Sequence, residues 1–175
     1  MIKYIANAVG IAAVIVYLLS YQQKTQKKIA AFNMTCRGLY VLQYVLLGAF
    51  SGAVLDILCM IALLPAQRKG KVWVQKGRIW IIAASALALI VAGLLLDQSI
   101  FGLLVILGCI LQMLAFWMDS EKKVRLVCLM ACPCWLAYNL ASGAFGSSIG
   151  DVMSMISILV AMVRYDFKKN EKTAQ

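Results

Sequence analysis

Seven long apolar runs follow one another along this 175-residue chain, and they constrain its fold more than any other feature. A helix needs about 20 mostly apolar residues to cross the hydrocarbon core of a bilayer. Hydrophobic residues make up 63% of the chain, more than a soluble domain can bury. We therefore predict an all-α membrane protein with seven transmembrane helices. The predicted helices span residues 4–21, 32–48, 50–67, 79–96, 99–118, 126–144 and 148–165.

The distribution of positive charge predicts the orientation of these helices. The chain carries 17 Lys and Arg against 7 Asp and Glu. When the helices cross the membrane in order, the first, third and fifth loops and the C-terminus lie on one face. About 16 of the cations lie on that face, including Arg37, whose side chain is expected to snorkel to it. Lys3 lies on the other face. The positive-inside rule then makes the C-terminus cytoplasmic and leaves the N-terminus outside.

The two ends of the chain resemble each other when one is shifted by about 95 residues. Under this shift the basic pair Lys27-Lys28 matches Lys122-Lys123. Three helices reverse the direction of the chain, so the extra helix at 79–96 restores it and makes the two units parallel. We predict a first three-helix repeat at 1–70, a basic loop and linker helix at 71–98, a second three-helix repeat at 99–166 and a cytoplasmic tail at 167–175. The strongest matches are Gly48-Ala49-Phe50 with Gly143-Ala144-Phe145, and Asp56 with Asp151.

Asp56 and Asp151 are the sharpest functional signal, because an acid at membrane depth costs about 2.5–3.5 kcal/mol on insertion scales. Two such acids at matching positions are expected to face an internal cavity. An aromatic residue stands sixteen positions before each acid, Tyr40 in the first unit and Trp135 in the second. Together with Asn139 these residues form our predicted substrate site, in which rings flank a polar anchor. The alternative for each acid is a hydrogen bond to a neighbouring helix.

The aromatic residue, the sixteen-residue gap and the polar residue resemble the substrate site of SWEET and SemiSWEET sugar transporters, in which a tryptophan pairs with an asparagine. The segment Leu18–Lys27 is similar to their PQ-loop region, with Tyr21-Gln22 in place of Pro-Gln. Trp135-x-x-Tyr138-Asn139, followed by Gly143 and the Asp151 helix, resembles the YgjV-type family of bacterial inner membrane proteins. This resemblance implies a SWEET-like arrangement of repeats and a multi-pass protein of the bacterial cytoplasmic membrane.

The function predicted from these features is small-solute transport by alternating access around a central cavity, with proton coupling or selectivity for cations and amines. The alternative is a membrane receptor or assembly factor that uses the same fold without transport. An enzyme is not expected, because the chain contains no histidine and no H-E-x-x-H or G-x-S-x-G motif.

The expected partners are a small polar solute and the lipid bilayer, with no nucleic acid, and a homo-oligomer is compatible with the sequence. No cofactor is expected. Six cysteines fall mostly within apolar runs, where cysteine usually behaves as a small hydrophobic residue. Cys132-Pro133-Cys134 leaves a second interpretation open, since paired thiolates can hold a soft metal. We predict packing around a proline rather than a metal site.

Overall fold

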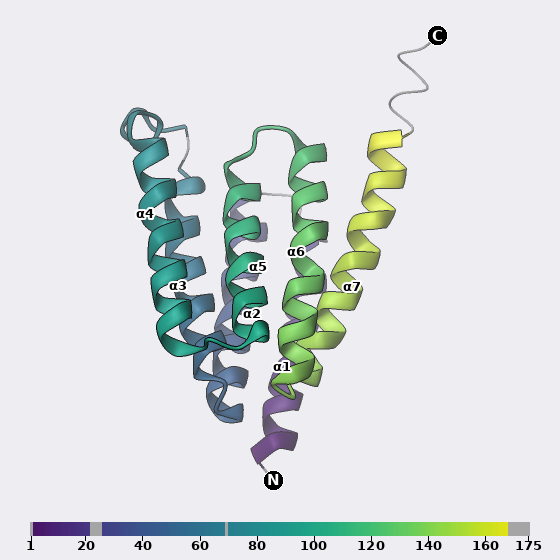
Figure 1. The fold of residues 1–175 in the computed structure, drawn as a ribbon. Coiled ribbons are helices and arrows are strands. Elements are labelled where there is room, and N and C mark those ends of the chain that lie inside the picture. The colour runs from purple at the N-terminus through teal and green to yellow at the C-terminus, as the bar shows by residue number, and fades with distance from the viewer. Residues whose placement is uncertain (1, 22–25, 69, 168–175) are drawn as a thin grey trace.

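The computed structural model describes residues 2–21, 26–68 and 70–167, and these residues form a bundle of seven α-helices that ends in a short π-helical turn (Figure 1). The tail predicted for 167–175 lies, beyond Phe167, outside the described residues, as do residues 22–25 of the PQ-loop-like segment. The elements are α1 (Ile2–Tyr21), α2 (Gln26–Leu47), α3 (Phe50–Ala66), α4 (Val72–Leu96), α5 (Ile100–Trp117), α6 (Glu121–Ala141), α7 (Phe145–Ala161) and the π-helical turn η1 (Met162–Phe167).

Four helical stretches in the described part of the chain are long and apolar enough to cross a membrane. They are Val72–Leu96, Ile100–Trp117, Lys122–Ala141 and Phe145–Arg164. The apolar stretches Ile2–Tyr17 and Phe50–Ala66 are shorter. α2 is 22 residues long and has the polar segment Gln26-Lys27-Lys28 in its first turn. Within the described residues, length and composition thus support four membrane crossings.

Several helices begin earlier than the sequence predicted. α4 was expected at 79–96 after a basic loop, but it starts at Val72 and includes Lys76 and Arg78 in its first turns. α6 and α7 likewise begin at Glu121 and Phe145 instead of at 126 and 148. Apolar runs mark only the part of a helix that lies among apolar surroundings, and a helix continues through charged residues whose long side chains reach water.

Two tight turns join α2 to α3 and α6 to α7 at the same end of the bundle as the N-terminus (Figure 1). Gly48 and Gly143 have φ angles of 74° and 72°, a conformation that glycine adopts without steric cost. The residue after each glycine, Ala49 or Ala144, has nearly identical backbone angles in the two turns. We call this end of the bundle the turn end. The opposite end, with the α3–α4 and α5–α6 connections and η1, is the basic end.

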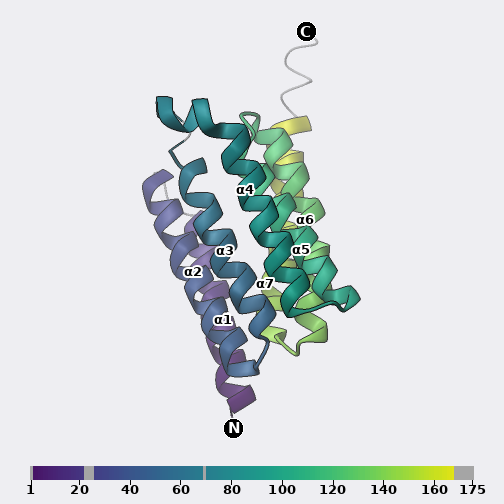
Figure 2. The ribbon, with the colours of Figure 1, turned by 60° about the vertical axis from the view of Figure 1, so that its left-hand side comes forward.

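We call α1, α2 and α3 the first group of helices and α5, α6 and α7 the second group, and these groups contact each other through two pairs of helices (Figure 2). Within the first group α2 contacts α1 and α3, and within the second α6 contacts α5 and α7. Between the groups α1 contacts α7, and α3 contacts α5. α4 lies against α3 and α5 and leaves most of its apolar surface uncovered. A bilayer would cover that surface.

Candidate functional site

A cavity of about 290 Å³ lies between the two groups of helices. Its lining runs along α6 from Val124 and Arg125, near the basic end, to Asn139, near the turn end. The same cavity is lined by α1, α2, α3, α5 and α7. We call it the central cavity. It is large enough for a compact solute but lies at the lower limit of drug-sized binding sites.

All five residues of the predicted site line the central cavity. Tyr40 comes from α2, Asp56 from α3, Trp135 and Asn139 from α6, and Asp151 from α7. Both acids therefore face the cavity and not just the outer surface of the bundle. The structure thus brings together residues that are up to 111 positions apart in the sequence, between Tyr40 and Asp151.

The two acids have different partners. Asp56 forms an ion pair and a hydrogen bond with Arg37, one helix earlier, and the side chains of Asp56 and Arg37 are only 4% and 13% exposed. The prediction that Arg37 snorkels to the cytoplasmic face was therefore wrong. The packing of α2 against α3 buries the Arg37 guanidinium beside the Asp56 carboxylate, and each of the two charges compensates the other.

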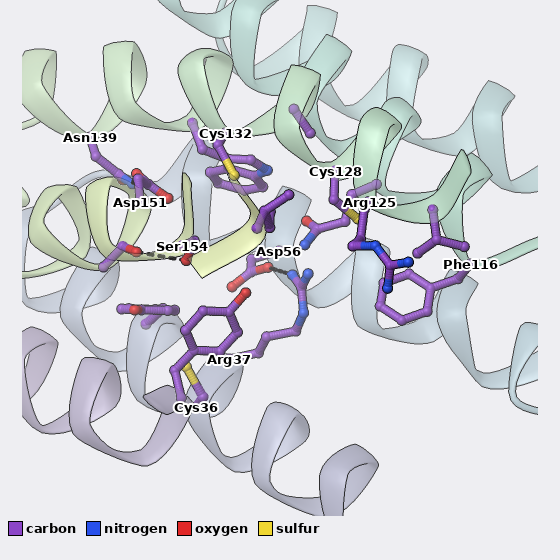
Figure 3. Close-up of a pocket in the computed structure, with 18 of the residues that line it drawn as sticks. Cys36, Arg37, Asp56, Phe116, Arg125, Cys128, Cys132, Asn139, Asp151 and Ser154 are labelled. Atoms are coloured by element: carbon purple, nitrogen blue, oxygen red, sulfur yellow. Dashed lines mark hydrogen bonds and ion pairs between the residues drawn. The ribbon is translucent and has the colours of Figure 1, made fainter. Parts of the chain in front are cut away.

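Asp151 accepts a hydrogen bond of 2.7 Å from the side-chain amide of Asn139. No described side chain forms an ion pair with it. Figure 3 shows Asp151 and Asn139 at one end of the cavity, with the Arg37–Asp56 pair in the middle and Arg125 beside Phe116 at the other end. The two acids therefore match in sequence position but differ in electrostatic environment.

A layer of hydrogen bonds closes the central cavity on the side of the turn end. The hydroxyl of Tyr44 donates to the Asn139 side-chain oxygen at 2.6 Å, and the hydroxyl of Tyr138 accepts from the backbone N–H of Gly52 at 2.8 Å. Ser147 donates to the Gln43 side-chain oxygen at 2.5 Å. Each of these bonds joins the first group of helices to the second. We call Gln43, Tyr44, Tyr138, Asn139 and Ser147 the turn-end layer.

A second pocket of about 320 Å³ lies on the far side of this layer. Gly48, Ser51, Asp97, Ser99, Tyr138 and Ser142 are among its lining residues. Tyr138 lines this pocket, whereas its neighbour Asn139 lines the central cavity. The turn-end layer therefore separates two hollow regions of the protein.

Comparison with known proteins identifies the family to which the chain belongs. A family model described as Imp-YgjV, bacterial inner membrane protein, matches residues 4–169. The chain belongs to this family. No curated protein and no solved structure matches it. The match covers every helix, so the central cavity of this Imp-YgjV chain lies within the region that defines the family.

In this Imp-YgjV protein two close contacts hold the aromatic residues at the cavity wall. The indole edge of Trp135 lies against Gly108 of α5, where a Cβ atom would come within 3.0 Å of the ring. The Tyr40 hydroxyl lies against Gly150 of α7, next to Asp151. A Cβ atom at Gly150 would force the Tyr40 hydroxyl to shift, and one at Gly108 would press against the Trp135 ring. The aromatic rings are thus fixed by packing.

Sequence reasoning missed two residues of the Imp-YgjV site. Arg37 pairs with Asp56 instead of reaching the membrane surface, and Tyr44 is not among the predicted site residues. Tyr44 could have been found, because it matches Asn139 under the same shift that relates Asp56 to Asp151, and the two matched residues bond to each other. Gln43 and Tyr138 also match under this shift, and each forms a hydrogen bond to another helix.

Proposed function

We propose that this chain is a small-solute transporter that works by alternating access, with all seven helices crossing the membrane. The observation that carries the proposal is the central cavity, which both groups of helices line and which the turn-end layer closes on one side. A cavity at membrane depth with polar groups on its wall is the usual position of a transporter site. Opening the turn-end layer would connect it to the second pocket.

The helix contacts support two parallel repeats related as in SWEET-type transporters. Exchanging α1, α2 and α3 with α5, α6 and α7 converts the α1–α7 contact into the α5–α3 contact. The hydrogen bonds follow the same exchange, since Gln43 bonds to residue 147 and its counterpart Tyr138 bonds to residue 52. Two such halves can rock against each other about a site between them.

The placement of charge supports a cytoplasmic basic end and an outside N-terminus. Arg68, Lys71 and Lys76 lie around the α3–α4 connection, and Lys122 and Lys123 lie in the first turn of α6. Lys3 lies at the turn end. In this orientation the central cavity extends toward the cytoplasm, and the second pocket faces outside. The protein described here is then in its inward-facing state.

A chain of hydrogen bonds connects the site to the layer that closes it. Asn139 donates to Asp151 and accepts from Tyr44, so its side-chain amide takes part in both the site and the layer. A proton or cationic group that binds to Asp151 competes with Asn139 for the carboxylate. Loss of that bond weakens the hold of Asn139 on Tyr44, which gives the occupant of the site an influence on the layer.

The experiment uses a cysteine that already lines the cavity. A variant with Cys36→Ala and Cys128→Ala keeps Cys132 as the thiol on the cavity wall, and a further Cys132→Ala change gives the background. A membrane-impermeant thiol reagent is applied to right-side-out and to inverted membrane vesicles. Alternating access predicts that Cys132 is labelled from both sides. Tyr138→Phe, which weakens the turn-end layer, is expected to increase labelling from outside.

Labelling from the cytoplasmic side alone, in both the parent and the Tyr138→Phe variant, would overturn the proposal. It would mean that the cavity never opens outward. A receptor with a fixed cavity gives that result. Uptake can then be screened in proteoliposomes with sugars, amines and amino acids at several pH values.

A further inference from the structure

One carboxylate of the central cavity, that of Asp151, has no ion-pair partner among the described residues, and the remaining cation of the lining, Arg125, lies at the far end of the cavity (Figure 3). Arg37 neutralises Asp56, so that pair adds no net charge to the site. Asp151 has only the neutral amide of Asn139 as its described partner. The residue that matches Arg37 in the second repeat is Cys132, which also lines the cavity. The second half of the protein therefore keeps the acid but has lost the cation.

Two aromatic side chains line the same cavity as this single acid. The Tyr40 hydroxyl lies against Gly150, the residue before Asp151, and Trp135 lines the same cavity from α6. The face of a tryptophan or tyrosine ring attracts a cation, and the attraction is strongest where water is excluded. One carboxylate with two aromatic rings is a common way to recognise an organic ammonium group.

Other classes of solute fit this arrangement less well. A neutral sugar would leave the Asp151 charge without a partner at membrane depth, and an anion would be repelled by it. A divalent metal ion requires several hard oxygen ligands, and the described residues contain no group of three or more acidic, Cys or His side chains that could hold one. The small cavity volume favours a compact molecule.

We propose that the solute is a small organic cation, a primary or quaternary amine, whose ammonium group binds to Asp151 between Trp135 and Tyr40. This inference rests on the proposed function for its transport step, but binding can be measured without transport. A proton is the natural competitor, because it neutralises the same carboxylate. Exchange of one monovalent cation for one proton would leave the net charge of the site unchanged.

Other charged and titratable groups around the cavity bear on this competition. The nearest charged neighbours are Arg37 and Asp56, which neutralise each other, and Arg125 lies at the far end (Figure 3). α5 contributes no titratable side chain to the lining. The remaining titratable groups are Tyr17 of α1, Cys36, Tyr40 and Tyr44 of α2, and Cys128 and Cys132 of α6. Asp151 is thus the carboxylate in this lining that is free to exchange a proton for a cation.

The test measures binding to the purified full-length protein in lipid nanodiscs by calorimetry and by thermal stabilisation. The probes are choline, ethanolamine and 3,3-dimethyl-1-butanol, the last of which has the shape of choline without its charge. We expect at least one amine to bind about tenfold or more tightly than the neutral alcohol. Binding is expected to weaken as the pH falls, because protons compete for Asp151.

Variants of the protein distinguish the effect of the Asp151 charge on binding from a loss of folding. Asp151→Asn is expected to weaken amine binding by about tenfold or more, whereas Asp119→Asn, which removes an exposed acid outside the cavity, should leave it unchanged. If Asp151→Asn fails to fold, Cys132→Arg serves as the second variant, because it restores the cation that the first half has. Cys132→Arg is expected to weaken amine binding by about tenfold or more, and Cys132→Gln, which controls for the length of that side chain, is expected to weaken it less.

Equal binding of the neutral alcohol, undiminished binding by Asp151→Asn, or no amine binding at any pH would each overturn the inference. Amine binding without uptake into proteoliposomes would support the inference and overturn the proposed transport. Uptake of a neutral solute without amine binding would support the proposed transport and overturn the inference.

Discussion

The buried ion pair between Arg37 and Asp56 provides the most direct test of the structure. The two side chains are 13% and 4% exposed, so each charge depends almost entirely on the other for compensation. Removing one member of a buried pair typically costs about 3–5 kcal/mol, and insertion scales give about 2.5–3.5 kcal/mol for an unpaired charge at membrane depth. We therefore expect Arg37→Gln and Asp56→Asn each to lower the free energy of unfolding by about 3 kcal/mol.

The double variant distinguishes this explanation from a general effect of mutation. Gln and Asn together leave no charge in the pair and can still form a hydrogen bond, so the double variant should lie within about 1 kcal/mol of the parent. The measurement is reversible unfolding in mixed detergent micelles. The expected coupling energy between the two positions exceeds about 2 kcal/mol.

A matched control exists at the surface. Arg78 and Asp119 form an ion pair of 3.8 Å, but the side chains are 46% and 74% exposed. The same cycle with Arg78→Gln and Asp119→Asn should give a coupling energy below about 1 kcal/mol. If the effects of Arg37→Gln and Asp56→Asn simply add, the two charges are not paired, and Asp151 is then not distinguished from Asp56 by the lack of an ion-pair partner among the described residues.

Three further predictions concern close contacts in the fold. Tyr138→Phe removes the acceptor for the backbone N–H of Gly52 and should lower the free energy of unfolding by about 1–3 kcal/mol; an unchanged value would remove Tyr138 from the turn-end layer. Gly146→Ala should cost about 1–3 kcal/mol, because its Cβ would come within 2.8 Å of the α1 backbone, whereas Gly38→Ala, with open space around it, should be neutral or stabilising by up to about 1 kcal/mol. Equal effects of these two changes would contradict the α1–α7 packing. Gly143→Ala forces a side chain into a backbone with φ of 72° and should cost about 1 kcal/mol in the same unfolding assay, while a stabilising effect would contradict the turn geometry.

The positions of the helices and turns could be predicted largely from the sequence, because their causes are local. Long apolar runs determine where a helix can lie in lipid, and Gly48 and Gly143 mark the turns that the structure shows at those positions. The start of α4 was predicted seven residues late, at 79 instead of Val72. Apolarity reports the surroundings of a helix, whereas its hydrogen bonds continue through charged residues near the membrane surface.

The spacing of the aromatic and acidic residues also predicted that these residues lie near one another. Residues at equal distances from equal turns lie at similar depths in the bundle, so Tyr40, Trp135, Asp56 and Asp151 were expected near one another, and all four line the central cavity. This expectation needed only helix geometry and the shift between the two halves.

Only the tertiary structure decided which charges meet. The sequence predicted equivalent positions for Asp56 and Asp151 and a position at the membrane surface for the Arg37 side chain. In the folded protein Arg37 pairs with Asp56, and Asp151 accepts a hydrogen bond from Asn139. The strength of a charge pair depends on separations of a few ångströms and on how much water remains between the groups. Those quantities are set by how helices far apart in the chain pack together, and no local pattern of residues contains them.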